Sequence, residues 1–295
     1  MMLAAFKHDR IDVNGVTIHL RHGGSGPPLL LLHGFPQTHV IWHKIADELA
    51  RHYTLVMPDL RGYGDSSKPP GLPDHSNYSK RAMAQDMLEV MGALGFASFL
   101  LCGHDRGGRV AHRLARDHPA AVQKLMLIDI APTRTMYEHT DQAFATAYYH
   151  WFFLIQPAPL PETLIGNSAA FFLHTTLGGW GSQGAGHIDP SAMAEYERCF
   201  CTPQAIHAAC EDYRAAAAID LEHDRDHDSR KIACPTHVVW GDQGVIERLF
   251  DPLRDWQAKC ALPVSGRSLP AGHFIPEQVP QLLLAEMLEF FGADS

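Results

Sequence analysis

One stretch of the chain, Phe99–Arg113, restricts the possible folds more than any other. Four apolar residues lead into the turn Gly103–Gly107, and a helical pattern starts directly after it. This order predicts a strand, a sharp turn and a helix, an elbow that lifts its central side chain above a sheet. Both glycines are needed because strand and helix pack too closely there for larger side chains. The central residue is Asp105, which predicts a carboxylate nucleophile that attacks carbon and forms an ester, although the turn alone also fits an exposed Asp without a catalytic role.

The alternation of apolar segments and helical periodicity predicts an α/β fold. Leu29–Leu32 is a short continuous apolar run, as a strand buried on both faces requires. Apolar residues between positions 80 and 94 recur at helical spacing, and Asn14-Gly15 favours a type I′ hairpin turn. Further strands are expected at Thr54–Met57, Phe99–Cys102 and Leu125–Ile128. Such alternation is typical of a mostly parallel sheet with crossover helices.

The pattern changes in the middle of the chain. From about Pro132 to Ala218 the sequence has helical and loop signals but no clear strand, and alternation resumes at Thr236–Trp240. We therefore expect an α/β core in two parts, residues 1–133 and 219–295, with a helical cap inserted at residues 134–218.

Composition limits the partners and the compartment. The formal charge of -9 argues against nucleic acid and anionic membranes as partners, but a small anionic substrate remains possible because a local pair of arginines can override the net field. The six cysteines lack CxxC spacing and a secreted-framework pattern, which indicates thiols in a reducing compartment. No apolar run approaches the roughly 18 residues of a membrane span, so we expect a cytoplasmic protein.

A run of histidines and aspartates, His223–Asp228, is the one stretch that looks like a metal cluster. Its mixed charge fits a solvent-facing linker better. We therefore expect neither a metal ion nor an organic cofactor.

Two further residues complete a candidate catalytic triad in the chain order of elbow hydrolases, which is nucleophile, acid, histidine. His273 lies between the last predicted strand and the last helix, where it would sit above the sheet as a general base. The usual acid position after Trp240-Gly241 holds Gly244, and Asp242 comes two residues early. We favour Asp129, at the end of the strand after the elbow helix, and keep Asp242 as the alternative.

Residues next to the nucleophile indicate the substrate. The backbone N–H groups of Phe35 and Arg106 are in position to form an oxyanion hole. The side chains of Arg106 and Arg109 share one face of the elbow helix, and two guanidinium groups beside Asp105 would hold the carboxylate of a small acid. The alternative is that these arginines pair with acidic side chains of the protein.

Motifs along nearly the whole chain resemble the α/β-hydrolase superfamily and, within it, the fluoroacetate (haloacetate) dehalogenases. The motifs that carry this resemblance are His33-Gly-Phe-Pro-Gln37, Arg61-Gly-Tyr-Gly-Asp-Ser66, Gly103-His-Asp-Arg-Gly-Gly-Arg109, Leu127-Ile-Asp-Ile-Ala-Pro-Thr133, His150-Trp151 and Gly272-His-Phe274. Epoxide hydrolases and haloalkane dehalogenases typically have Trp directly after the nucleophile. Arg106 at that position favours the haloacid branch.

The resemblance implies a role for each matching residue. It makes Asp105 the nucleophile, His273 the base and Asp129 the acid, with Arg106 and Arg109 as the carboxylate clamp. It makes His150, Trp151 and Tyr213 the halide-binding residues, although Tyr148 and Tyr149 compete with Tyr213. It also implies a homodimer and no cofactor.

These observations predict hydrolysis of a haloacetate to glycolate and halide through an aspartyl ester. The nearest alternative is an epoxide hydrolase that uses the same Asp, His and Asp. The second alternative is a non-catalytic small-ligand binding protein on this scaffold. The residues do not decide whether fluoride is cleaved or only chloride and bromide.

Overall fold

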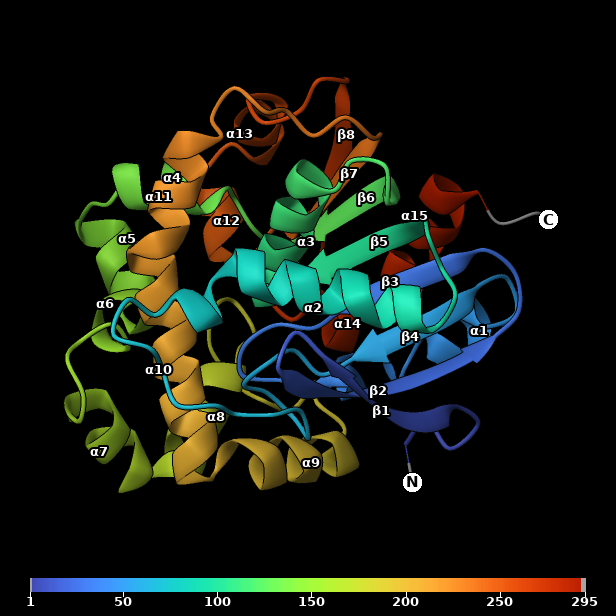
Figure 1. Cartoon of the computed structure of the whole chain (residues 1–295). Coiled ribbons are helices and arrows are strands. Elements are labelled where there is room, and N and C mark those ends of the chain that lie inside the picture. Colours follow the sequence, from blue (N-terminus) through green and yellow to red (C-terminus); the bar gives the residue numbers. More distant parts are fainter. Residues whose placement is uncertain (1, 293–295) are drawn as a thin grey trace.

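The computed structural model describes residues 2–292. The first residue and the last three residues of the two predicted core segments, 1 and 293–295, lie outside this range. Its centre is an eight-stranded sheet in the order β1-β2-β4-β3-β5-β6-β7-β8 (Figure 1). The strands β3 to β8 run parallel, and β2 pairs antiparallel with both β1 and β4. The strand bounds are β1 (Lys7–Val13), β2 (Val16–Gly24), β3 (Pro28–Leu32), β4 (Thr54–Pro58), β5 (Phe99–His104), β6 (Val122–Ile128), β7 (Thr236–Gly241) and β8 (Val264–Leu269).

The first hairpin forms as its turn residues predict. Val13 pairs with Val16, and the two residues between them, Asn14 and Gly15, have φ angles of 45° and 76°. A type I′ turn needs positive φ at both central positions, which Asn and Gly tolerate best.

The central strands are buried on both faces because side chains alternate between two cores. Leu30, Leu32 and Leu101 pack on one face, with helices α2 and α3, and Leu29 and Leu31 pack on the other, with α1 and α15. This arrangement explains why the strands read as continuous apolar runs instead of alternating ones. The helices before β6 are η1 (His39–Trp42), α1 (Ala46–Leu49), η2 (Ser76–Tyr78), α2 (Lys80–Ala93) and α3 (Asp105–Asp117).

A group of helices separates β6 from β7 and gathers beyond the carboxyl ends of the parallel strands (Figure 1). These helices are α4 (Thr133–Glu138), α5 (Gln142–Ala147), α6 (His150–Phe153), α7 (Leu160–Gly166), α8 (Ala169–Leu177), α9 (Pro190–Phe200), α10 (Pro203–Ala217) and α11 (Ile219–Asp226). The chain then completes the core with β7, α12 (Val245–Leu249), α13 (Pro252–Gln257), β8, α14 (Ile275–Gln278) and α15 (Pro280–Phe291). The expected α/β architecture is confirmed.

The expectation of a linker at His223–Asp228 is wrong. His223 to Asp226 belong to helix α11, and Asp224 is buried against α3, where its carboxylate pairs with Arg116 at 2.8 Å. Of the charged residues in this stretch, Asp224 faces the core, whereas Arg225, Asp226 and Asp228 are exposed.

No helix between residues 2 and 292 is long and apolar enough to span a bilayer. All six cysteines are free thiols.

Candidate active site

Asp105 occupies a strained turn between β5 and α3. The strand ends at His104, the helix begins at Asp105, and Asp105 has a φ of 46°, in the left-handed region that costs free energy for a residue with a Cβ. The elbow is tight: a Cβ on Gly107 would lie 2.3 Å from the carbonyl oxygen of His33. The sequence therefore folds locally so that Asp105 is presented at the carboxyl edge of the sheet.

The carboxylate of Asp105 is buried and held by the backbone. The N–H of Phe35 donates to Oδ1 of Asp105 at 2.9 Å, and the side chain is 6% exposed. Burial works to raise the pKa of Asp105, but the neighbouring His273 and the guanidinium groups of Arg109 and Arg106 outweigh it and hold that pKa below its usual value. The side chain is therefore an ionised carboxylate at neutral pH.

His273 and Asp129 approach Asp105 from the ends of two other strands. Nδ1 of His273 donates to Oδ2 of Asp129 at 2.5 Å, while Nε2 of His273 lies 3.8 Å from Oδ2 of Asp105. Nε2 has no hydrogen-bond partner within the described residues, so it is available to a water molecule beside Asp105. Asp129 itself is fixed by the N–H of Gly241, which donates to its Oδ1 at 2.9 Å.

The alternative acid, Asp242, is exposed at the surface. The structure thus brings Asp129, and not Asp242, to His273. Gly244 stands close to Asp129: a Cβ there would lie 3.5 Å from the Asp129 Oδ1.

The backbone of His273 is also fixed, by two aromatic residues that the sequence did not single out for the site. Its N–H donates to the carbonyl of Trp180 at 3.1 Å, and Nε2 of His104 donates to its carbonyl at 2.9 Å. Burial, with the charge of His273, lowers the pKa of His104 to about 3 and keeps this imidazole neutral. The Trp180 ring lies 5.1 Å from the His273 ring, edge to face, and 4.4 Å from that of His150.

The expectation for Arg106 is corrected in part. Its guanidinium is paired with Asp212, because Nε donates to Oδ2 at 2.9 Å and Nη2 donates to Oδ1 at 2.8 Å. Both side chains are fully buried. Two of the three guanidinium nitrogens therefore pair with an acidic side chain of the protein, as the alternative interpretation predicts. The third, Nη1, is buried without a partner among the described residues and remains free for a substrate.

Arg109 has no ion-pair partner: among residues 2–292, no carboxylate oxygen lies within 4.0 Å of its guanidinium nitrogens. Its Nη1 donates to the carbonyl of Ala131 at 3.0 Å and to the hydroxyl of Thr133 at 2.9 Å, and its buried Nε has no partner in the described part of the chain. Burial and the charge of Arg106 lower the pKa of Arg109, a sign that an anion beside it would be favourable.

The three predicted halide residues lie together. The His150 and Tyr213 ring centres are 5.5 Å apart, and those of Trp151 and Tyr213 are 6.3 Å apart. Tyr213 Oη and His150 Nδ1 are buried without partners among the described residues. Burial lowers the pKa of His150 to about 3, so this ring is neutral and keeps one N–H to donate.

The two arginines pack on the same aromatic residues. The Arg106 guanidinium carbon lies 4.1 Å from the centre of the Tyr213 ring, and that of Arg109 lies 4.6 Å from the Trp151 ring. The carboxylate-binding and halide-binding candidates therefore adjoin one another.

Of the two competing tyrosines, Tyr149 is 47% exposed, and its ring centre lies 6.1 Å from that of His150. Tyr148 stays close, since its ring centre lies 5.2 Å from that of His150 and 6.5 Å from that of His273. The geometry thus places both Tyr213 and Tyr148 beside the site, and only Tyr213 beside Arg106.

Nothing in the sequence singles out Asp212, which holds Arg106. This carboxylate also accepts from the hydroxyl of Tyr63 at 2.6 Å and contacts the Lys80 ammonium group. Burial works to raise the pKa of Asp212, but Arg106 and Lys80 outweigh it and hold that pKa well below its usual value. Four residues from four separate segments form this network, which is why spacing alone could not reveal it.

Comparison with known proteins agrees with the fold. The family model of the alpha/beta hydrolase fold matches residues 27–278. A fluoroacetate dehalogenase from Burkholderia sp is 47% identical over 289 residues, which cover 98% of this chain and 95% of that protein. A soluble epoxide hydrolase from Corynebacterium sp. (strain C12) is 30% identical, with 98% and 99% covered.

Among solved structures, the crystal structure of ALR0039 from Nostoc sp PCC 7120 is similar over 99% of this chain and 100% of that one, with 55% identity and a TM-score of 0.97. These likenesses extend over the elbow, the inserted helices and the His273 loop alike. The chain therefore belongs to the α/β-hydrolase superfamily and, within it, to the fluoroacetate (haloacetate) dehalogenase family.

Proposed function

We propose that this chain is a hydrolase of carbon–halide bonds that converts a small 2-haloacid, such as a haloacetate, into the hydroxyacid and free halide. One observation carries the proposal: a buried, ionised Asp105 stands beside a His273–Asp129 pair and two buried arginines, each with an N–H that has no partner among residues 2–292. The His273–Asp129 pair can activate the water that hydrolyses an ester, and the arginines can bind the carboxylate of a substrate. The 47% identity with a fluoroacetate dehalogenase supports the same function.

In the first step, an oxygen of Asp105 displaces halide from the α-carbon of the substrate. Free N–H groups of Arg106 and Arg109 bind the substrate carboxylate and hold that carbon over Asp105. His150, Trp151 and Tyr213 each donate one hydrogen bond to the leaving halide, which offsets part of its lost hydration. The products of this step are a glycolyl ester of Asp105, for a haloacetate, and a halide ion.

In the second step, water hydrolyses the ester. His273 Nε2 takes a proton from water, and the Asp129 carboxylate stabilises the resulting imidazolium. The water oxygen attacks the carbonyl carbon of Asp105, and the oxyanion is held by the N–H groups of Phe35 and Arg106. The N–H of Phe35 already donates to Oδ1 of Asp105 in the free protein. The C–O bond between the Asp105 carbonyl carbon and the ester oxygen then breaks, and glycolate leaves with this oxygen as its hydroxyl group, which takes the proton from the His273 imidazolium. The re-formed Asp105 carboxyl group releases one proton to solvent, so haloacetate and water give glycolate, halide and one proton.

An epoxide hydrolase would use the same three residues, so the assay must distinguish the two. A neutral epoxide gains little from two buried arginines, whereas a carboxylate gains a charge-assisted hydrogen bond from each. The test measures halide release from fluoroacetate, chloroacetate and bromoacetate beside diol formation from styrene oxide. Halide without diol supports the proposal, diol without halide overturns it, and the three rates show which halide is preferred.

Three finer expectations belong to the same proposal. The helical cap would comprise residues 134–218, since α10 ends at Ala217 and α11 returns to pack on the core through Asp224. The six free thiols support a cytoplasmic location. Exposed apolar side chains on α7 and α8, with Phe171 at 74% exposure, support a homodimer. Light scattering after gel filtration measures the last of these directly.

A further inference from the structure

The backbone N–H of Phe35 belongs to a peptide unit whose direction is fixed from its other side. This N–H donates to Oδ1 of Asp105 at 2.9 Å, and the carbonyl of Gly34 lies in the same planar peptide unit. That carbonyl accepts from the N–H of Gln37 at 2.9 Å and from Nδ1 of His33 at 3.0 Å. Because the C=O and N–H of a trans peptide point in opposite directions, two donors on the carbonyl direct the N–H toward Asp105. The direction of this oxyanion donor therefore depends on the loop that carries it.

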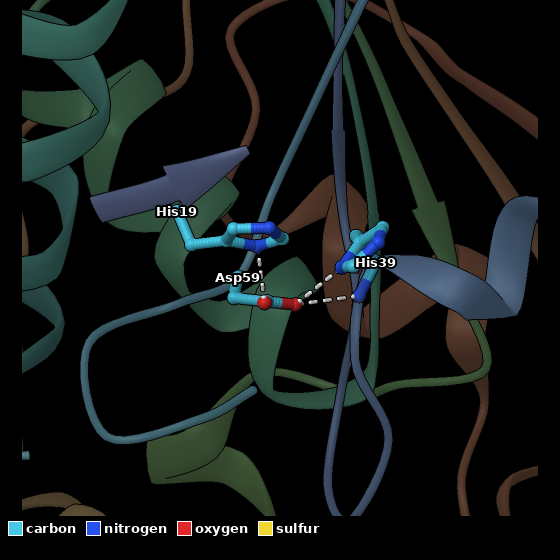
Figure 2. Close-up of side chains that lie close together, drawn as sticks. All are labelled: His19, His39 and Asp59. Atoms are coloured by element: carbon cyan, nitrogen blue, oxygen red, sulfur yellow. Dashed lines mark hydrogen bonds and ion pairs between the residues drawn. The ribbon is translucent and has the colours of Figure 1, made fainter. Parts of the chain in front are cut away.

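The loop of residues 33–39 is held at both ends by two consecutive residues that follow β4. At the first end, Nε2 of His33 accepts from the N–H of Leu60 at 3.0 Å. Burial lowers the pKa of His33 and keeps the ring neutral, as an acceptor nitrogen requires. At the other end, Oδ1 of Asp59 accepts from the N–H of His39 at 2.9 Å and from its Nδ1 at 2.8 Å (Figure 2). The residues directly after β4 thus fix the segment that contains Phe35.

Asp59 is itself firmly anchored. Its side chain is buried, and its second oxygen, Oδ2, accepts from Nδ1 of His19 at 2.7 Å and from the N–H of Asp65 at 3.0 Å (Figure 2). Its own N–H donates to the carbonyl of His19 at 2.9 Å, and its carbonyl accepts from the hydroxyl of Ser66 at 2.7 Å. Burial works to raise the pKa of Asp59, but His39 and His19 outweigh it and hold that pKa well below its usual value. An ionised carboxylate with four donors cannot rotate without losing hydrogen bonds.

The two imidazoles that contact Asp59 are alike toward the carboxylate but differ in what they are joined to. Each donates its Nδ1–H to one carboxylate oxygen, and both side chains are buried (Figure 2). His39 belongs to the loop that carries Phe35, whereas His19 lies on β2. If His19 is removed, the N–H of Asp65 still holds Oδ2 of Asp59, and both bonds from His39 to Oδ1 remain. His19 is therefore a matched control for His39.

We propose, on the basis of the proposed function, that Asp59 and His39 are positioning residues that keep the Phe35 N–H directed at the Asp105 carboxylate. In the first step negative charge leaves this carboxylate as it displaces halide. In the second step negative charge develops on the carbonyl oxygen of the ester, so the hydrogen bond from Phe35 strengthens there. A loosened loop should therefore slow ester hydrolysis and spare halide displacement.

The test measures the two steps separately in single turnovers of chloroacetate with enzyme in excess. Rapid-quench halide release reports displacement, and mass spectrometry of the intact protein follows the decay of the ester. We expect ester hydrolysis to slow by about tenfold in His39→Ala, in which the backbone N–H still contacts Asp59, and by about 10²-fold in Asp59→Ala, near the lower limit for losing an oxyanion donor. Halide release should change little in both variants, and His19→Ala should hydrolyse the ester as the parent does.

A second readout needs no turnover. In protein labelled with nitrogen-15 phenylalanine, the amide resonance of Phe35 is identified by its absence from Phe35→Leu. Loss of the hydrogen bond to Asp105 should move this amide proton upfield in His39→Ala and leave it in place in His19→Ala. Urea unfolding should show similar losses of stability in these two variants, because each removes one buried imidazole from the same carboxylate.

Three results would overturn the proposal: equal slowing of both steps in His39→Ala, an unchanged ester step in that variant, or an equal defect in His19→Ala. An unmoved Phe35 resonance in His39→Ala would overturn it as well. Where Asp59→Ala does not fold, His39→Ala decides alone. Absence of halide release in the parent contradicts the proposed function, and the Phe35 resonance then still tests whether Asp59 and His39 direct this N–H.

Discussion

Asp212 holds Arg106 by two parallel hydrogen bonds, at 2.9 and 2.8 Å, and so leaves only Nη1 of that guanidinium without a partner in the described chain. A buried arginine that is free to rotate would lose its alignment with a substrate carboxylate. Asp212 thus fixes the orientation of the Arg106 guanidinium, so that Nη1 can serve as a hydrogen-bond donor. Asp212 also compensates the positive charge of Arg106 before substrate binds.

Asp212→Asn should therefore weaken substrate binding more than it slows turnover. We expect KM for chloroacetate to rise by about tenfold or more, and the free energy of unfolding to fall by about 3–5 kcal/mol, the usual cost of breaking a buried ion pair. Steady-state kinetics and urea unfolding measure the two effects. Asp220→Asn is the matched control, because Asp220 approaches Lys80 of the same network without touching Arg106. An unchanged KM in Asp212→Asn would exclude the positioning role.

Gly34 leaves the space in which Asp105 sits. A Cβ at this position would lie 2.5 Å from the Asp105 Cβ and 2.8 Å from its Oδ1. Gly34→Ala should displace the nucleophile and lower kcat/KM by about 10²-fold or more, as misplacement of reacting groups by about 1 Å does. The comparison is Gly92→Ala in α2, where no atom lies within 4 Å and helix propensity should add about 0.5–1 kcal/mol of stability. Similar kinetics in the two variants would contradict this packing argument.

The role of Asp129 can be separated from that of Asp242 by a pair of variants. Asp129→Asn removes the carboxylate charge and places an NH₂ donor opposite Nδ1 of His273, because the one remaining oxygen accepts from Gly241. Ester hydrolysis should slow by about 10⁴-fold, so that the ester accumulates after one halide has been released. Asp242→Asn alters an exposed residue and should turn over as the parent does. Rapid-quench halide release and mass spectrometry of the intact protein detect the trapped ester. A severe defect in Asp242→Asn alone would reverse the assignment.

The pH profile should show that the nucleophile stays ionised in acid. The pKa of Asp105 is held below its usual value, so the ionised form that attacks carbon persists as pH falls and is lost only below the ordinary carboxyl range. We expect kcat/KM for chloroacetate, which reports on halide displacement, to stay level from neutral pH down to about pH 4. Recovery of full activity on return to neutral pH controls for unfolding. An acid limb in kcat/KM above about pH 5 would contradict this account.

The parts of the fold that could be predicted are those that local sequence determines. The elbow at Asp105, the Asn14-Gly15 hairpin and the doubly buried strands each follow from backbone preference or from apolar pattern over a few residues. Membership of the superfamily follows from the same motifs and is confirmed.

What could not be predicted depends on contacts between distant segments. Asp212 lies 106 positions after Arg106, and nothing in the sequence around either residue indicates that they meet. The His19–Asp59–His39 cluster likewise joins a strand, a loop and a short helix. The charges of His223–Asp228 predict a linker where the structure has the end of α11, because the ion pair of Asp224 with Arg116 cannot be inferred from local charge.

The most direct measurement of the central claim is a single turnover in oxygen-18 water with enzyme in excess over chloroacetate. If Asp105 forms the ester and water attacks its carbonyl carbon, the heavy oxygen appears in the Asp105 carboxylate, and glycolate carries unlabelled oxygen from the protein. Peptide mass spectrometry of the segment that contains Asp105 reads the label. Oxygen-18 in glycolate with none in Asp105 would mean that water attacks the substrate directly, and the covalent mechanism would then be wrong.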